Sequence, residues 1–513
     1  MNKFVVNGPQ DTSGIPHKPI GKLLIDAFST FDKNAIAVVR NLTPHFEFST
    51  MNLATSLRLL GVSKGDIVGL VAENSTEFMI AYLASLFIAV PVHLINSKFT
   101  PYELGNILSL SQPCLLICTK KTHHNVREVA KDLDYIKTLI CLDVEKMLSA
   151  CSHESGFQVE DNFDTEEHIA VICNSSGTTG FPKCVMINHE MLRLHFTNGR
   201  SPDIFDMKTG DRNLLIMPFF HIYGMCALNA ALYTGTTIIP LDAFQPDLFL
   251  KTIQNYKVKL LILVPTLVNF FVNSPLVERY DLSSLKSVIC GGNCLSEEDA
   301  RLFQNRLNLQ RLQHGYGMTE AGIVLCSPFK TNSCGKLLCG YQMKVVDLEK
   351  GHALPPFQNG EICIKGQIMK RYFKNAEKTK EIIDSEGFLH SGDVGYYDDD
   401  GCFYISGRIK ELIKYKTWQV PPAELEQILV KFEGIKDVAV IGKADPRFGE
   451  LPTAVVVKEE GAEVTEKEIC EYLAGFVSDE KRLHGGVRFV ENIPRTYLGK
   501  IKRQELMKQL FNE

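Results

Sequence analysis

The stretch Asn174-Ser-Ser-Gly-Thr-Thr-Gly-Phe-Pro-Lys183 follows the apolar run His168-Ile-Ala-Val-Ile-Cys173 directly. Two glycines let backbone amides turn toward an anion, the hydroxyls add donors, and Lys183 supplies a positive charge. The stretch is not a Walker loop, since G-x-x-x-x-G-K-[ST] occurs nowhere in the chain. A solvated linker is the alternative interpretation. Because the loop follows a buried strand and precedes a helix, we interpret it as a phosphate-binding loop suited to a triphosphate.

Outward from this loop, short β-branched runs alternate with helical stretches from Asp66 onward. This alternation is typical of parallel sheets with helices on both faces. From about Gly340 to Ile405 the pattern changes to short strands broken by Gly, Asp and Pro, which predicts a small antiparallel β unit. After Lys410 the pattern predicts a compact α+β unit with a final helix from Lys502. We place the domain boundary near Arg408 to Lys410.

The composition excludes several classes of protein. The 513 residues are 45% apolar and 22% charged, which argues against disorder and fibrous repeats. The 55 basic and 60 acidic residues give a net charge of −5, so we expect no nucleic-acid partner. Fifteen scattered cysteines without a CxxC pair favour reduced thiols inside the cell. The apolar stretch from Phe78 to Ile95 contains Pro91, so we predict a core helix running into a strand rather than a transmembrane segment.

Two further stretches carry residues suited to nucleotide chemistry. Gln313-His-Gly-Tyr-Gly-Met-Thr-Glu320 reads as a glycine-rich turn in which Tyr316 could stack on a base and Glu320 could hold Mg²⁺. In His390-Ser-Gly-Asp-Val-Gly-Tyr396, the carboxylate of Asp393 can accept two ribose hydroxyls, and Arg408 can reinforce those contacts. Taken alone, each stretch also fits an ordinary turn or a solvated surface.

Together, four segments resemble the acyl-adenylate-forming superfamily, which includes acyl-CoA synthetases, 4-coumarate–CoA ligases and beetle luciferases. The segments are SSGTTGFPK, PFFHIYGM (Pro218 to Met225), GYGMTE, and SGDVGYYDDDG with GRIKELIKYK, and they occur in the family's order. The resemblance covers about Lys22 to Lys508. It implies an α/β fold in which a large domain of two doubly wound βα subdomains and a small β-barrel unit is followed by a small α+β C-terminal domain. It also implies a large domain over 1–408 and a small mobile domain over 409–513, with a hinge near Lys410.

The resemblance implies a reaction in which a carboxylic acid attacks the α-phosphate of Mg·ATP, after which coenzyme A takes the acyl group and AMP leaves. Oriented donors, a metal ion and lysines, rather than a covalent nucleophile, would stabilise the charge on phosphorus. Carried over by position, the nucleotide-binding residues would be Ser175, Ser176, Gly177, Thr178, Thr179, Lys183, His314, Gly315, Tyr316, Gly317, Met318, Thr319, Asp393 and Arg408. Glu320 would face Mg²⁺. Lys500, with Lys183, Thr319 and His221, would be catalytic.

The small domain would rotate about Lys410 between the two half-reactions. Lys500 would then serve adenylation, and another face, comprising Lys414, Lys416, Thr417 and Gln419, would serve thioester formation with CoA. At Thr417 the family usually has glycine, so its side chain could narrow the approach of CoA. Cys184, in place of the usual glycine after Lys183, is a second departure that we expect to be tolerated.

The substrate residues implied by the resemblance are His221, Tyr223, Gly291 and Gly292, in an aromatic and apolar pocket that suits a fatty or arylalkanoic acid. Phe219 is expected in the core instead. A luciferase-like oxygenase is one alternative, although Ile323 and His195 stand where beetle luciferases have serine and arginine. A nucleotide-binding pseudoenzyme is another, because of Thr417 and Cys184.

For the rest of the molecule, we expect a monomer or weak homodimer that binds only small molecules. We also expect an intracellular location. The cytoplasm is preferred over the peroxisome, because the C-terminal residues are not the S-K-L signal.

Overall fold

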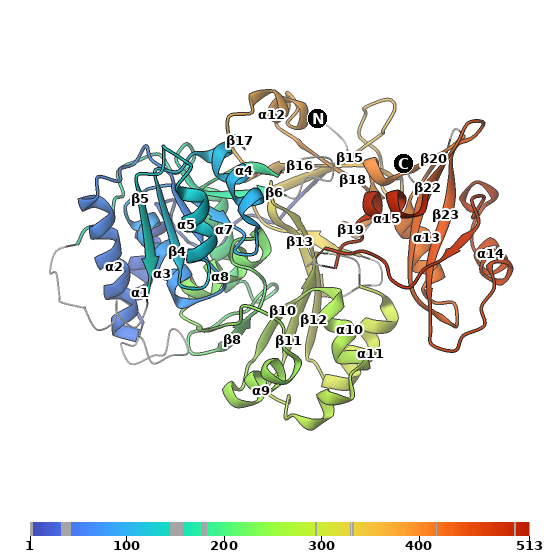
Figure 1. The fold of residues 1–513 in the computed structure, drawn as a ribbon, viewed down its shortest axis with the longest axis horizontal. Helices are drawn as coiled ribbons and strands as arrows, with labels where there is room; N and C mark the ends of the chain where they lie inside the picture. Colours follow the sequence, from blue (N-terminus) through green and yellow to red (C-terminus); the bar gives the residue numbers. More distant parts are fainter. Residues whose placement is uncertain are drawn as a thin grey trace.

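The computed structural model describes residues 4–31, 43–143, 157–175, 182–292, 295–328, 330, 333–416, 418–496 and 499–511. These residues form three sheets with flanking helices (Figure 1). The first two sheets build a large domain, and the third builds a small C-terminal one at the right of the view. The α/β fold class predicted from the sequence is therefore confirmed.

The first sheet is mostly parallel and has the order β17-β7-β6-β3-β2-β4-β5. Strands β6, β3, β2, β4 and β5 are parallel, whereas β7 is antiparallel to both of its neighbours. The strands are β2 (Val68–Val71), β3 (Val92–Ile95), β4 (Leu115–Thr119), β5 (Thr138–Leu142), β6 (Ile169–Ser175), β7 (Lys183–Asn188) and β17 (Arg371–Tyr372). The helices of this region are α1 (Ile20–Phe28), α2 (Thr43–Leu59), α3 (Thr76–Phe87), α4 (Pro101–Ser111), α5 (His123–Ala130) and α7 (His189–Arg200).

The second sheet is parallel at one end and antiparallel at the other, in the order β1-β15-β16-β18-β19-β14-β13-β12-β11-β10-β8-β9. The parallel strands are β8 (Arg212–Leu215), β9 (Thr237–Pro240), β10 (Leu260–Leu263), β11 (Ser287–Gly291) and β12 (Arg311–Met318). Their helices are α8 (Ile222–Thr234), α9 (Pro246–Tyr256), α10 (Pro265–Asn273), η1 (Pro275–Arg279) and α11 (Glu297–Leu307).

The antiparallel unit expected between Gly340 and Ile405 is present, and it continues the second sheet through β13 and β14. Its strands are β1 (Val5–Asn7), β13 (Gly322–Pro328), β14 (Gly335–Leu337), β15 (Tyr341–Val346), β16 (Gly360–Gly366), β18 (Leu389–Tyr397) and β19 (Cys402–Arg408), with helix α12 (Ala376–Ile382) before β18. Because β12 belongs to both halves, the parallel part and the antiparallel part meet at His314 to Met318.

The third sheet belongs to the C-terminal unit. Its strands β22 and β23 form a long hairpin, β20 and β24 pair with β23, and β21 pairs with β20. Its elements are η2 (Ile409–Glu411), β20 (Ile413–Tyr415), β21 (Trp418–Val420), α13 (Pro422–Leu429), β22 (Ile435–Asp445), β23 (Gly449–Lys458), α14 (Glu466–Ala474), η3 (Asp479–Lys481), β24 (Val487–Phe489) and α15 (Arg503–Phe511). It has apolar clusters of its own on each side of this hairpin.

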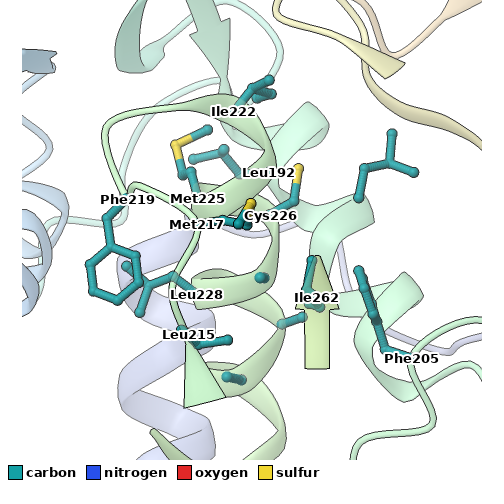
Figure 2. Close-up of a cluster of buried hydrophobic side chains, with 14 of the residues drawn as sticks. Leu192, Phe205, Leu215, Met217, Phe219, Ile222, Met225, Cys226, Leu228 and Ile262 are labelled. Carbon is teal, nitrogen blue, oxygen red and sulfur yellow. The ribbon is translucent and has the colours of Figure 1, made fainter. Parts of the chain in front are cut away.

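Helices α3 and α8 lie inside the core of the large domain and are apolar on nearly every face. The prediction of a core helix running into a buried strand between Phe78 and Ile95 is confirmed by α3 and β3. Figure 2 shows Phe219 beside α8 among buried side chains such as Met217, Met225 and Leu228. Phe219 is fully buried with its ring centroid 5.4 Å from that of Phe78, so its expected core position is also confirmed.

Within the described ranges, we find no helix whose length and apolar character would let it cross a bilayer.

Candidate functional site

The expected phosphate loop joins two antiparallel strands, β6 and β7, and Ser175 pairs with Lys183 across the hairpin. The prediction that this loop precedes a helix was wrong, because β7 stands between the loop and α7. Ser176, Gly177, Thr178 and Thr179 lie outside the described residues. Lys183 begins β7, and its Nζ lies 4.6 Å from the centre of the Tyr372 ring.

Tyr372 links Lys183 to the turn between β12 and β13. Its hydroxyl donates a hydrogen bond to Oε1 of Glu320 at 2.7 Å. Glu320 and the preceding Thr319 are both buried. Tyr372 therefore contacts both Lys183 and Glu320, which come from two other segments of the chain.

His314 to Met318 lie in strand β12, so the expected glycine-rich turn is an extended strand that ends in a hairpin. The pairing with β13 has a bulge between Tyr316 and Gly317. A Cβ atom on Gly317 would lie 2.1 Å from the carbonyl oxygen of Gly322, so only glycine fits there. His314 is buried, and its Nδ1 lies 2.8 Å from the carbonyl oxygen of Ser333. Gly315 pairs with Gly291 of β11.

The buried carboxylate of Asp393 in β18 is the centre of a cluster of polar and charged side chains. Its Oδ2 accepts a hydrogen bond from the Tyr316 hydroxyl at 2.6 Å, and its Oδ1 lies 2.9 Å from Nε of Arg408 in β19. Burial raises the pKa of the Asp393 carboxyl, and Arg408 and Tyr316 oppose that rise by stabilising the charged form. The structure thus unites the tyrosine, aspartate and arginine predicted separately from two motifs.

Lys500 of the small domain lies next to this cluster, with its Nζ 3.6 Å from Oε1 of Glu411. Burial and the nearby Arg408 guanidinium lower the pKa of Lys500, whereas Glu411 and Asp393 oppose the decrease. The preceding Gly499 has a φ of +83°, and a Cβ atom on it would lie 2.7 Å from Cγ2 of Thr266 at the start of α10. The Lys500 loop therefore touches the large domain.

The residues expected to face the acid come together at the N-terminus of α8. His221 caps the helix, and its Nδ1 accepts from the Tyr223 amide at 3.3 Å. Burial lowers the pKa of His221 to about 4, so the imidazole is neutral at pH 7. The Tyr223 hydroxyl lies 3.2 Å from the carbonyl oxygens of Leu263 and Ile289, and a Cβ atom on Gly291 would lie 3.1 Å from it. Gly292 follows in a left-handed conformation with a φ of +83°.

The residues expected to serve the thioester step lie farther along the small domain. Lys410 lies in η2, and Lys414 in β20 pairs with Gln419 in β21, although the Gln419 side chain is outside the described part. Lys416 is exposed, with Nζ 4.7 Å from the centre of the Tyr415 ring. Thr417 itself lies outside the described residues, so its effect on CoA stays a prediction.

The donor set fits a magnesium nucleotide. Glu320 offers a buried carboxylate with one oxygen held by Tyr372, the hard oxygen ligand that Mg²⁺ prefers. Lys183, Arg408 and Lys500 could supply positive charge for phosphates, and Asp393 could supply acceptors for hydroxyls.

Comparison with known families decides the class of the chain. The model of the AMP-binding enzyme family matches residues 47–373, and that of the AMP-binding enzyme C-terminal domain matches residues 424–500. The chain belongs to the AMP-binding enzyme family. The first match includes the motifs SSGTTGFPK, PFFHIYGM and GYGMTE, and the second includes Lys500, so the resemblance to this superfamily is confirmed.

Relatives of this AMP-binding enzyme include luciferases and CoA ligases. Luciferin 4-monooxygenase of Nipponoluciola cruciata is 40% identical over 468 residues, covering 88% of this chain and 85% of that protein. 4-Coumarate–CoA ligase 1 of Petroselinum crispum is 37% identical over 480 residues, covering 90% and 87%. The solved structure of ATP-bound MatB from Rhodopseudomonas palustris superposes with a TM-score of 0.86 at 25% identity, covering 96% and 99% of the two chains. This AMP-binding enzyme is therefore an adenylate-forming protein of the acyl-CoA ligase and luciferase superfamily.

His195 and Ile323, the two positions at which the sequence was expected to differ from beetle luciferases, are buried. His195 is fully buried, with Nε2 3.0 Å from Sγ of Cys226, and burial lowers its pKa to about 3. Ile323, on β13, is also buried. Cys184, the second departure from the family pattern, packs with Ile172 and Met186, and burial raises the pKa of its thiol to about 12. An inert apolar thiol at Cys184 agrees with the expectation that this change is tolerated.

Tyr372 and Glu411 were missed in the sequence, because Tyr372 lies outside the four motifs and Glu411, although inside one, was assigned no role there. Tyr372 sits on the two-residue strand β17 and reaches Glu320 over a long sequence separation. Glu411 lies in the GRIKELIKYK segment, where its neighbouring lysines suggested a solvated face. Only the fold shows that both side chains contact site residues.

Proposed function

We propose that this AMP-binding enzyme is an ATP-dependent acid–CoA ligase that activates a hydrophobic acid as an acyl-adenylate and transfers the acyl group to CoA. The observation that carries the proposal is the contact of the Lys500 loop, in the small domain, with Thr266 of the large domain, which places the Lys500 ammonium group in the electrostatic field of the Asp393–Arg408 pair. A protein that only bound a nucleotide would not need a lysine brought in by a second domain. The motifs that the resemblance assigns to ATP, Mg²⁺ and the acid surround this point.

In this proposal each group has a defined role. Asp393 accepts hydrogen bonds from the ribose hydroxyls, while Tyr316 and Arg408 hold its carboxylate in place. Tyr316 presents its ring to the base. Lys183 stabilises the β- and γ-phosphates, and Lys500 stabilises the negative charge that develops at the α-phosphate as the acid attacks. When bound to Glu320, Mg²⁺ neutralises phosphate charge.

The small domain is proposed to comprise residues 409–513 and to rotate about Lys410. Arg408 ends β19 of the large sheet, and Lys410 lies in the short helix η2 that separates it from β20. Rotation there would withdraw Lys500 and present Lys414, Lys416, Thr417 and Gln419 to the site. These residues are the proposed face for CoA.

The proposed acid is fatty or arylalkanoic. His221 is neutral when buried, and Tyr223 uses its hydroxyl on backbone carbonyls. Neither group provides the charge that would pair with a second carboxylate on the substrate. A Cβ atom on Gly291 would lie 3.1 Å from the Tyr223 hydroxyl, so glycine at this position lets the Tyr223 ring pack against β11. These features favour an apolar tail.

A luciferase-like oxygenase is the second candidate, favoured by the 40% identity to the luciferase of Nipponoluciola cruciata. It is disfavoured by His195 and Ile323, which replace the arginine and serine of beetle luciferases with a neutral imidazole and an apolar side chain. We predict no appreciable light from luciferin, ATP and oxygen. Strong emission under these conditions would overturn the ligase proposal in favour of the oxygenase.

The direct test is a panel of fatty and arylalkanoic acids incubated with ATP and Mg²⁺, with and without CoA. AMP and acyl-CoA are both quantified. The proposal predicts acid-dependent AMP together with thioester. Acyl-adenylate without thioester would contradict the CoA step and implicate the Thr417 loop. If no acid gave AMP, the ligase proposal would be wrong and a nucleotide-binding pseudoenzyme would be favoured.

A further inference from the structure

Strand β18 is distorted where it presents Asp393. Against β16, His390 pairs with Cys363 and Val394 pairs with Glu361, so three residues of β18 oppose one residue of β16. The extra length includes Gly392, whose φ of +72° is left-handed. Such an irregularity re-aims a side chain, and here the re-aimed side chain is Asp393. Residues 391–393 do not form the regular backbone hydrogen bonds to β16, so other groups must satisfy their backbone polar atoms on this side.

The side chain of Glu361, on the neighbouring strand β16, makes hydrogen bonds to this segment in place of the backbone of β16. Its Oε1 accepts the Gly392 amide at 3.0 Å, and its Oε2 lies 2.7 Å from Nδ1 of His390. Ser391 completes the arrangement by accepting the Asp393 amide on its Oγ at 3.0 Å. The carboxylate of Glu361 therefore contacts the residues on both sides of Ser391, and the second of these, Gly392, directly precedes the proposed ribose ligand Asp393.

We propose that Glu361 and His390 are positioning residues that hold the distorted segment of β18 so that Asp393 reaches the ribose hydroxyls. The inference rests on the proposed function, because it takes Asp393 to bind the ribose of ATP. Neither Glu361 nor His390 needs to touch the nucleotide. Their effect is transmitted through the backbone of Ser391 to Asp393.

The charged groups around His390 make its interaction with Glu361 dependent on pH. Its Nε2 lies 3.6 Å from Oδ2 of Asp384, and Lys344 stands nearby, held by Asp384 at 3.4 Å and by Glu386 at 2.7 Å. The hydrogen bond to Glu361 raises the pKa of His390 above 6.5, with Asp384 adding to the rise and burial and Lys344 opposing it. The charged pair with Glu361 is thus complete below pH 6.5 and weakens as the pH rises through the higher folded value.

The thiol of Cys363 also lies near His390, with Sγ 3.6 Å from Nδ1. The three potential metal ligands Glu361, Cys363 and His390 lie within 4.8 Å of one another. Burial raises the pKa of the Cys363 thiol strongly, and the direct bond between Glu361 and His390 already satisfies both groups. The positioning role accounts for the cluster without a metal ion.

The test compares the selectivity for ATP over 2′,3′-dideoxy-ATP in acid-dependent AMP formation, measured as the ratio of kcat/KM values. Glu361→Ala should reduce this ratio at least about 10-fold, because Asp393 loses its position relative to the ribose. Glu361→Gln keeps a hydrogen-bonding side chain without charge and should retain most of the ratio. Glu386→Ala removes a carboxylate that contacts Lys344 but not the segment, so it is the matched control and should behave as the wild type.

Between pH 6.5 and 9, the wild-type ratio should fall as His390 loses its proton, whereas Glu361→Gln should give a flatter profile. The inference would be overturned if Glu361→Ala kept the wild-type selectivity ratio, or if Glu386→Ala lost as much selectivity as Glu361→Ala. It would also be overturned if the ratio depended on pH in Glu361→Gln as it does in the wild type. Because Glu361→Gln is expected to fold, a folding failure of Glu361→Ala leaves the pH comparison decisive. A wild-type enzyme that forms no AMP, or that does not distinguish the two nucleotides, would instead overturn the proposed function.

Discussion

At the scale of single residues, the proposed chemistry depends most on Lys500. Its ammonium group is partly buried, contacts Glu411, and is affected electrostatically by both Asp393 and Arg408, which belong to the proposed nucleotide site. Charges in such protected positions act more strongly on a transition state than exposed ones.

Lys500→Ala should therefore abolish adenylation, with a loss of at least about 100-fold in rate. It should spare thioester formation from preformed acyl-adenylate, because that step uses another face of the small domain. The measurements are acid-dependent pyrophosphate exchange and single-turnover thioester formation. Equal loss of both steps would count against the two-state scheme.

The pH dependence of adenylation gives a second test of the same side chain. Because the pKa of Lys500 is below 10.5, the group loses its proton at a lower pH than an exposed lysine. Adenylation should then decline on the basic side below pH 10.5, and the decline should move to higher pH in Lys500→Arg, since arginine stays charged. An identical basic limb in both proteins would show that another group controls it.

At the scale of structural elements, the bulge between β12 and β13 shapes the part of the site proposed to bind the nucleotide. Gly317→Ala would force a Cβ atom against the Gly322 carbonyl oxygen, at a cost of about 1–3 kcal/mol or more. We expect a lower Tm in thermal unfolding and a higher KM for ATP. Gly105→Ala in helix α4 is the matched control, because its Cβ would meet only ordinary contact at 3.7 Å. Equal effects of both changes would contradict the steric argument.

The sequence predicted these elements unevenly, and the reasons are physical. Runs such as Leu260–Leu263 followed by α10 were predictable, since strand and helix periods differ clearly there. Strand β7 was missed because its residues directly follow a loop rich in Gly and Pro and lead straight into α7. Strand β12 contains two glycines, which locally resemble a turn, and only pairing with β11 and β13 keeps it extended.

The site itself was predicted as a set of motif residues but not as a network. The motifs predicted Tyr316, Asp393 and Arg408 as site residues. Their mutual contacts, however, depend on the pairing of β18 with β19 and on the hydrogen bond from the Tyr316 hydroxyl, on β12, to Asp393. The partners Tyr372, Glu361 and Glu411 were not predictable, because strand register and domain packing bring them in from other segments.

At the scale of the whole molecule, the contact between the Lys500 loop and α10 defines the arrangement of the two domains. Gly499 approaches Thr266 so closely that a larger side chain at either position would interfere. Thr266→Arg should therefore slow adenylation about 10-fold or more by displacing Lys500. It should leave thioester formation from preformed adenylate nearly unchanged.

Asn269→Arg is the matched control for this prediction, because Asn269 is exposed on the same helix. It adds the same charge and a similar volume to α10 and should leave both steps unaffected. If Asn269→Arg slowed adenylation as much as Thr266→Arg, the effect would reflect charge on α10 rather than contact with the small domain.

The central claim is that the acid is activated by direct attack of its carboxylate on the α-phosphate. The most direct measurement supplies an accepted acid labelled with ¹⁸O in both carboxylate oxygens, together with ATP, Mg²⁺ and CoA, and determines the label in the products by mass spectrometry. Direct attack predicts one ¹⁸O in each AMP and none in pyrophosphate, because the attacking oxygen stays on the α-phosphorus when CoA takes the acyl group. Unlabelled AMP, or ADP with labelled inorganic phosphate, would contradict it.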